Sequence, residues 1–232
     1  MTTVDAVLIG RPTAFGPNGE PSGIDKQPAQ GPVRVTRTGL AGDGQGDRRH
    51  HGGAEKAVHH YPFEHYAAWR AETPALAPRL AAPGAFGENL STRGLTEREV
   101  CIGDVWRLGS AVVQVSQGRQ PCWRLNVRFD DTGMARRVQA SGRTGWYYRV
   151  LAAGAIAAGD ALVLLERPQP AWPLARVLEV LYRDTLNREA LAVIAAMPEL
   201  AISWRELAER RLARGRVEDW SRRLTTPERV RP

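Results

Sequence analysis

The chain has 232 residues, 43% of them hydrophobic, and a formal net charge of +7. This length allows one large domain with a small appendage, and no apolar run approaches the roughly 18–20 residues that a membrane span needs, so we expect no membrane partner. The first ten residues lack the basic flank of a signal peptide, and two cysteines, Cys101 and Cys122, are too few for a disulfide framework, so the sequence favours the reducing cytoplasm.

Short alternating segments separated by glycine turns continue to about residue 166 and predict a mainly β protein, a barrel or a sandwich. A helix is predicted over 62–71, with Pro62 in its first turn and with Tyr66 and Trp69 on one face. The predicted strands cover residues 3–10, 31–38, 102–109, 111–115, 145–151 and 158–165.

Three prolines in 167–173 predict a linker between a β domain, 1–166, and a three-helix domain with its tail, 174–232. Apolar residues spaced i, i+3, i+4, i+7 from Leu174 indicate the first helix, and Asn187 is the expected cap of the second. Ser203 with Glu206 forms a capping box for the third helix, and Ile202 with Leu207 fits its hydrophobic staple.

Cys122 follows the predicted strand 111–115, after Gly118 and Pro121 end the strand pattern. Arg119 and Arg124 flank the cysteine, and two guanidinium groups that cannot lose their charge favour a thiolate, as a metal ligand or a nucleophile. The alternative, a small buried apolar residue, stays open from these residues alone.

Residues 39–53 hold six glycines with Asp, Arg and His side chains, a composition that lets the backbone approach a ligand closely. It is not a P-loop, because the Lys-Ser/Thr ending is missing.

Five histidines lie within residues 50–65 and suggest a zinc site, but their spacing matches no standard zinc motif. Lys26 is one of only two lysines, beside Lys56, and is a candidate point-charge contact to an anion.

Three motifs, at 39–61, 84–91 and 116–126, resemble in order, spacing and length the MOSC family, domains related to the C-terminal part of molybdenum-cofactor sulfurase. The likeness is strongest to the stand-alone bacterial proteins of the YiiM type, which often carry a three-helix domain after the MOSC domain. The resemblance implies a mainly β fold: a MOSC-type twisted β-barrel with a few helices, followed by a small three-helix C-terminal domain.

The resemblance also implies a molybdenum cofactor (molybdopterin), with Cys122 as the protein's ligand to molybdenum. Arg119 is the second candidate catalytic residue, because its charge would offset that of the sulfur and oxygen ligands. The phosphate group of the cofactor needs cations and converging backbone amides. The candidates for binding the cofactor, chosen from loop position and residue chemistry, are Lys26, His51, Gly52, Gly53, Asn89, Arg124 and Asn126. Pyridoxal phosphate binding is a further property that the resemblance suggests.

The implied reaction is reduction of N-hydroxylated compounds to amines: hydroxylaminopurine-type bases, hydroxamic acids or amidoximes. The chain has neither a dinucleotide fingerprint nor a cysteine cluster for iron–sulfur, so electrons must come from a separate reductase, which we expect to be a flavoprotein.

The helical tail is a candidate docking surface for that reductase or a dimer contact, so the chain is expected to be a monomer or a homodimer. The alternatives are a cofactor carrier without catalysis, a zinc hydrolase and a nucleic-acid-binding protein. The last is suggested by the basic run at 210–216, but interleaved acidic residues argue against a nucleic-acid partner.

Overall fold

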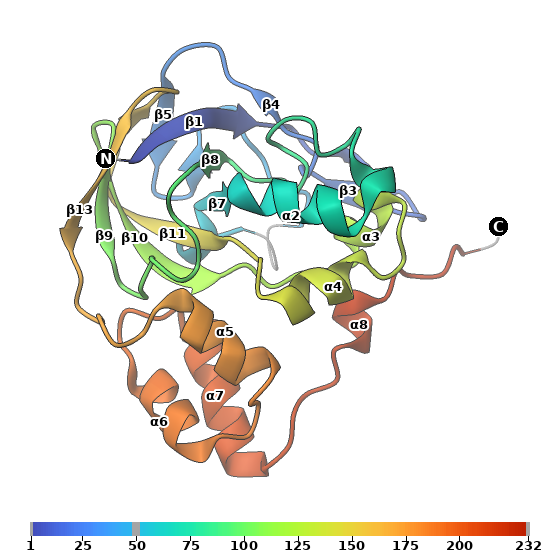
Figure 1. Ribbon diagram of the computed structural model, residues 1–232, viewed down its shortest axis with the longest axis vertical. Helices are drawn as coiled ribbons and strands as arrows, with labels where there is room; N and C mark the ends of the chain where they lie inside the picture. Colours follow the sequence, from blue (N-terminus) through green and yellow to red (C-terminus); the bar gives the residue numbers. More distant parts are fainter. Residues whose placement is uncertain (1, 48–51, 231–232) are drawn as a thin grey trace.

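Seven strands of the main sheet close into a barrel (Figure 1). The structure, a computed structural model, describes residues 2–47 and 52–230. Hydrogen-bonded neighbours follow the order β13-β9-β10-β11-β7-β8-β1, and β13 also pairs with β1, so the ring is complete. The strands are β1 (Thr2–Ile9), β2 (Thr13–Ala14), β3 (Pro21–Ser22), β4 (Gln27–Pro28), β5 (Val33–Thr36), β6 (Gly39–Leu40), β7 (Val58–Pro62), β8 (Leu90–Thr92), β9 (Val105–Leu108), β10 (Ala111–Gly118), β11 (Trp146–Ala152), β12 (Gly154–Ile156) and β13 (Ala161–Glu166).

The pairing in the barrel is antiparallel except between β7 and β8, which run parallel. Two small sheets, β12-β5-β6 and β2-β3, and the short strand β4 beside β1 lie at its margins. Alternation explains the half-buried strands: in β5, Val33 and Val35 are buried while Arg34 between them is exposed. The predicted mainly β barrel is therefore confirmed.

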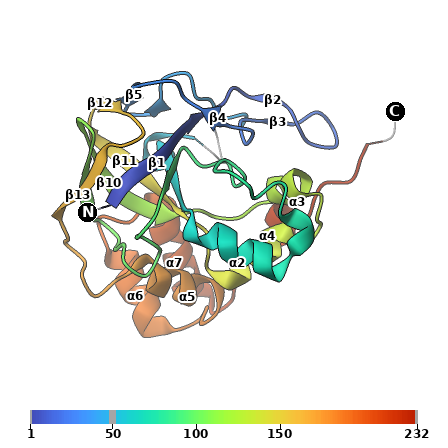
Figure 2. The same ribbon diagram turned by 45° about the horizontal axis from the view of Figure 1, so that its top comes forward.

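Helices cover one side and one end of the barrel, as the two views in Figure 1 and Figure 2 show. In both views α5, α6 and α7 form one group, whereas α2, α3 and α4 lie along the side of the barrel. The helices are η1 (Ala54–Lys56), α2 (Glu64–Glu72), η2 (Pro74–Leu76), α3 (Arg124–Phe129), α4 (Met134–Ser141), α5 (Leu174–Tyr182), α6 (Arg188–Ala196), α7 (Ile202–Arg214) and α8 (Ser221–Leu224). None of the helices in the described part of the chain combines the length and apolarity needed to cross a membrane.

The buried apolar residues form two clusters. The larger one is continuous from the barrel interior, with Val113 and Val115, into the three helices, with Leu178 and Trp204. The smaller one lies between α2, α3, α4 and α8, around Phe86. The segment 167–173 is fixed between the barrel and the helices, because its residues form backbone contacts with residues 101 and 102.

The helix starts differ in part from the sequence-based predictions. Asn187 accepts a hydrogen bond from the Ala190 amide and caps α6, as predicted. Pro62 is the last residue of β7, and α2 begins at Glu64. The capping box is wrong: α7 begins at Ile202, so Ser203 lies inside it and no side chain caps its start. The staple is wrong too, because Ile202 is 58% exposed.

Candidate active site

A cleft that is partly open to solvent contains most of the predicted site residues. Segments from six parts of the sequence build it: the loop after β3, the loop after β6, η1 with the start of β7, the residues before β8, the loop after β10 with the start of α3, and β11. Its lining residues are Ser22, Gly23, Ile24, Lys26, Asp43, Gly44, Gln45, Gly46, Asp47, Lys56, His59, Phe86, Gly87, Asn89, Arg119, Cys122, Arg124 and Tyr147.

Cys122 lies in this cleft, between the end of β10 and the start of α3. It is 6% exposed, and no disulfide joins it to Cys101. Its carbonyl accepts the Leu125 amide at 2.9 Å, which fixes the turn into α3. The strand ends at Gly118, but it is longer than the predicted 111–115, because residues 116–118 belong to β10 and Gly118 pairs with Trp146.

Both arginines that flank Cys122 in the sequence line the same cleft. Arg119 is 7% exposed, and its Nη1 atom has no hydrogen-bond partner among the described residues. A buried guanidinium nitrogen without a protein partner points to a ligand or solvent acceptor in the cleft. The guanidinium of Arg124 stacks on the Trp123 ring at 4.6 Å. The cleft therefore presents positive charge beside the thiol.

Lys26 lines the cleft from the loop after β3, and it forms an ion pair with Asp43. The side chains of the pair are only 7% and 1% exposed. Burial lowers the pKa of Lys26, and the Asp43 carboxylate opposes that shift. Asp43 is held in turn by the Gly10 amide at 2.8 Å and by Asn89 Nδ2 at 2.9 Å.

Asn89 lines the cleft, but its amide is occupied within the protein. Its Nδ2 donates to the Leu8 carbonyl as well as to Asp43, and its Oδ1 accepts the His59 amide at 3.0 Å. Asn89 therefore orients Asp43 and β7 and supports the wall of the cleft from within the protein.

Asn126 is a predicted site residue whose side chain is held by contacts outside the cleft. Its side chain donates to the Leu224 carbonyl at 2.9 Å and accepts the Ala135 amide at 2.8 Å. Gly52 and Gly53, which precede η1, are not among the described residues that line the cleft. His51 falls outside the described residues.

Two glycines, Gly23 and Gly46, allow the loop after β3 and the loop after β6 to pack backbone against backbone. A Cβ on Gly23 would collide with the Gly44 carbonyl, and a Cβ on Gly46 would collide with the Pro21 carbonyl. The two loops that form one wall of the cleft can therefore lie against each other only because glycine stands at these positions.

The described histidines occupy three separate environments. His60 is fully buried between Tyr148 Oη, at 3.0 Å, and Thr92 Oγ1, at 2.8 Å. Burial, together with the positive charge of Arg119, holds the pKa of His59 well below its usual range, so the ring in the cleft is neutral. Among residues 2–47 and 52–230, no three His, Cys, Asp or Glu side chains meet in a way that could hold a metal ion.

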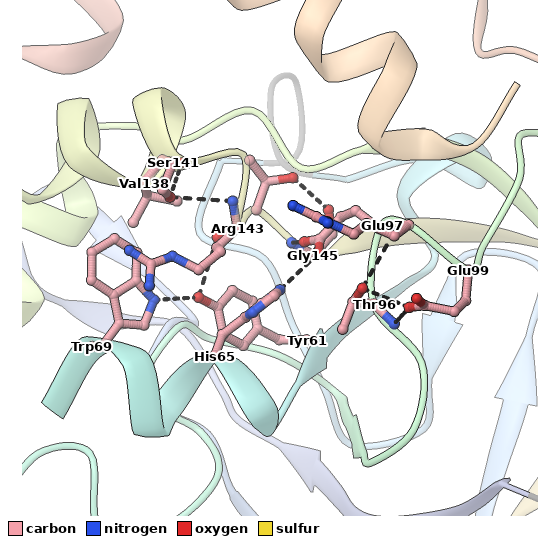
Figure 3. Close-up of polar contacts among 12 residues, drawn as sticks. Tyr61, His65, Trp69, Thr96, Glu97, Glu99, Val138, Ser141, Arg143 and Gly145 are labelled. Atoms are coloured by element: carbon pink, nitrogen blue, oxygen red, sulfur yellow. Dashed lines mark hydrogen bonds and ion pairs between the residues drawn. The ribbon is translucent and has the colours of Figure 1, made fainter. Parts of the chain in front are cut away.

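His65 belongs to a hydrogen-bonded network with Glu97 and Gly145 (Figure 3). Glu97 stands between His65 Nε2, at 2.7 Å, and the Gly145 amide, at 2.6 Å. The Gly145 carbonyl then accepts the Arg119 amide at 3.0 Å. This chain of contacts links α2 and the buried carboxylate to the backbone that carries Arg119.

Sequence reasoning missed Lys56, Asp43, His59 and Tyr147 in the cleft. Burial lowers the pKa of Lys56, and the neighbouring Cys122 and Asp47 oppose the shift, so this lysine lies near the thiol. A signal was present, because Lys26 and Lys56 are the chain's only lysines and both line one cleft. Asp43, His59 and Tyr147 carry no comparable signal in the sequence.

Comparison with known proteins agrees with this architecture. The model of the MOSC domain matches residues 47–163, and that of the YiiM-like 3-alpha helix domain matches 172–215. Protein YiiM of Escherichia coli (strain K12) is 39% identical over 231 residues, covering 94% of this chain and 96% of that protein. A protein of Gibberella moniliformis named "Reductase" is 43% identical over 178 residues, 76% of this chain but only 31% of that protein. The crystal structure of YiiM from Geobacillus stearothermophilus superposes with a TM-score of 0.78 at 35% identity, covering 91% and 100% of the two chains.

Proposed function

Because the chain belongs to the MOSC family and carries a YiiM-like three-helix domain, we propose that it is a molybdenum-cofactor-dependent reductase of N-hydroxylated compounds. The family and the relative named "Reductase" support a reductase-type role. The observation that carries the proposal is the convergence of Cys122 with four cationic side chains in one cleft.

The residues of the cleft fit a cofactor of this class. Lys26, Lys56, Arg119 and Arg124 outnumber the acidic Asp43 and Asp47, so the charged side chains of the lining are net positive. This net positive charge favours an anionic group. Arg119 Nη1, which has no hydrogen-bond partner among the described residues, can donate to it. Cys122 supplies the soft sulfur ligand that suits a metal of variable oxidation state.

In the proposed reaction, a hydroxylamine-type R–NHOH takes up two electrons and two protons and gives R–NH₂ and water. The bound cofactor would supply the two-electron chemistry. Cys122 would hold the metal, Arg119 and Lys56 would offset negative charge near it, and Lys26, kept in place by Asp43, would bind the phosphate. Gly52 and Gly53 stay candidates for that phosphate through their amides.

A separate electron donor belongs to the proposal, and we expect a flavoprotein. We keep a cytoplasmic location as part of the proposal, because two cysteines are too few for the disulfide framework typical of secreted proteins. A nucleic-acid partner has little support from the helical tail: Arg211 is 1% exposed and pairs with Glu218, and Arg210 pairs with Glu206.

The test is molybdenum content by plasma mass spectrometry, after expression with molybdate in a host that makes the cofactor. We expect close to one molybdenum per chain in wild type, at least a tenfold loss in Cys122→Ser, and no loss in the control Cys101→Ser. Molybdenum retained by Cys122→Ser would contradict the ligand assignment.

Turnover separates the enzyme from a cofactor carrier. The loaded protein is mixed with a chemical reductant and an N-hydroxylated purine, and amine formation is followed by chromatography. We expect turnover in wild type and in Cys101→Ser but none in Cys122→Ser. A loaded wild type without turnover on purine, hydroxamic acid and amidoxime substrates would favour the carrier.

A further inference from the structure

The C-terminal segment 216–230 lies outside both matched family regions, which end at 163 and 215. It leaves the three-helix group and returns to the side of the barrel, where α8 lies beside α4 (Figure 1). Leu224 of α8 is 1% exposed and belongs to the smaller apolar cluster, with residues of α2, α3 and α4. The segment therefore joins the two domains: Glu218 pairs with Arg211 of α7, whereas Leu224 is packed onto the barrel domain.

Arg223 of α8 contacts the peptide groups on both sides of Cys122. Its guanidinium donates to the Pro121 carbonyl, and its own carbonyl accepts the Trp123 amide at 2.8 Å. The other guanidinium nitrogen donates to Gln139 Oε1 of α4 at 2.6 Å. One half-buried arginine thus fixes the backbone before and after the cysteine and ties it to a neighbouring helix.

The residues after Arg223 are held by the helix that follows Cys122. Asn126 of α3 donates to the Leu224 carbonyl at 2.9 Å and to Thr226 Oγ1 at 3.3 Å. Farther along, the Val230 amide donates to Asn18 Oδ1 at 2.7 Å, and Asn18 Nδ2 donates to the Glu228 carbonyl at 3.1 Å. Three successive parts of the segment are therefore hydrogen-bonded to the barrel domain, so the segment can act as a brace.

We propose that Arg223 is a positioning residue for Cys122 and that residues 216–230 are a brace that holds the cysteine loop in shape for its ligand. The role toward the metal rests on the proposed function, whereas the mechanical role does not. A rigid ligand loop matters because a metal site loses affinity when its supporting contacts are removed, by about 10- to 100-fold for partners that orient a ligand.

The first experiment is hydrogen exchange by mass spectrometry on the peptide covering 119–126, without cofactor. Arg223→Gln removes the guanidinium contacts but keeps the backbone carbonyl. We expect exchange in this peptide to accelerate at least tenfold, with β1 and β8 unchanged. The control is Arg222→Gln, the exposed neighbour in the same helix, which should exchange like wild type. Equal exchange in wild type and Arg223→Gln would overturn the brace.

The second experiment measures molybdenum per chain in the same variants, with circular dichroism as the folding control. We expect at least a threefold loss in Arg223→Gln and none in Arg222→Gln. Arg223→Lys keeps the charge but cannot bridge two acceptors as a planar fork, so it should resemble Arg223→Gln. Wild-type molybdenum content in Arg223→Lys, or in a faster-exchanging Arg223→Gln, would overturn the positioning role.

The two arms separate failure of this inference from failure of the proposed function. A wild type that never holds molybdenum defeats the proposed function, while hydrogen exchange still tests the brace. If Arg223→Gln does not fold, Gln139→Met removes the acceptor in α4 alone and should accelerate exchange in the same peptide by a smaller factor. No acceleration in that folded variant would count against the brace.

Discussion

Lys26 and Asp43 form a buried ion pair in the cleft. Asp43 is 1% exposed at its side chain and also accepts hydrogen bonds from the Gly10 amide and Asn89. The carboxylate opposes the loss of the lysine's charge that burial favours. The pair therefore keeps a cation at the cleft surface, where an anionic ligand can bind it. Each of the two buried charges depends on the other to offset the free-energy cost of its burial.

That dependence gives a stability prediction. Lys26→Met leaves Asp43 as an uncompensated buried charge and should lower the free energy of unfolding by about 3–5 kcal/mol. Lys26→Met/Asp43→Asn removes the charge as well and should be less destabilised than the sum of the two single variants. Urea denaturation of the four proteins measures the coupling. Strict additivity would mean that the pair contributes nothing to folding.

At the residue scale, the sequence predicted site residues by the rarity of a residue type or by position near the cysteine. Cys122 and Lys26 belong to types that occur only twice in the chain, Arg119 lies close to the cysteine in sequence, and all three line the cleft. Lys56 was missed, although its residue type is just as rare. Asn126 illustrates what sequence alone lacks. An asparagine near the cysteine has the right chemistry for a ligand, but its direction is set by the tail, 98 residues away, that its amide holds.

At the scale of whole elements, the helices of the C-terminal domain also show that the sequence predicts only the features that depend on local contacts. Asn187 caps α6 through a local contact with Ala190, so the sequence contained the whole signal. The start of α7 depends on a distant group instead. Ala201, which precedes the helix, donates its amide to the Ser116 carbonyl of β10 at 2.9 Å. Because that contact sets where α7 begins, the local Ser203–Glu206 pattern was not decisive.

The two cap candidates are a matched pair for mutation. Asn187→Ala removes a cap and should cost about 1 kcal/mol of unfolding free energy. Ser203→Ala, an exposed position inside α7, should change it by less than about 0.5 kcal/mol. Chemical denaturation monitored by far-ultraviolet circular dichroism checks both. A comparable loss in the two variants would mean that Ser203 caps after all.

The end of β10 is pressed against the helices. A Cβ on Gly118 would lie 2.9 Å from Trp204 Cη2 and 3.0 Å from Leu178 Cδ2. Gly118→Ala should therefore cost about 1–3 kcal/mol through overpacking. Gly133→Ala is the control, since its φ is −96° and the new methyl would meet its nearest neighbour at an ordinary 3.4 Å. Thermal unfolding compares the two variants. Equal midpoints would show that Trp204 and Leu178 can shift to accommodate the new methyl group at little cost in stability.

For the molecule as a whole, composition and turn spacing predicted a β domain followed by helices, but not how the parts join. The closing pair of β13 with β1 brings together residues about 160 positions apart, as in Thr2 with Leu162. The parallel pair of β7 with β8 and the return of the tail to the barrel are equally nonlocal. Such contacts leave no periodicity in the sequence, so only the resemblance to a known family anticipated the closed barrel.

One global property, the response to acid, follows from a residue inside that barrel. His60 is fully buried, and burial lowers its pKa to about 3. The unfolded chain binds a proton at His60 as the pH falls below about 6.5, whereas the folded chain does not until about pH 3. Between these values, each pH unit of acidification should remove about 1.4 kcal/mol of folding free energy.

His60→Asn isolates this contribution. The variant keeps a polar side chain beside Tyr148 and Thr92 and should be less stable at neutral pH, because the fit of the ring is lost. Its stability should nevertheless fall less steeply than that of wild type between about pH 6.5 and pH 4, by about 1.4 kcal/mol for each unit, since no imidazole remains to take up the proton. Urea denaturation at successive pH values measures both slopes. Parallel slopes would mean that His60 is protonated inside the folded barrel, with its hydrogen bonds to Tyr148 and Thr92 rearranged to accept the charge.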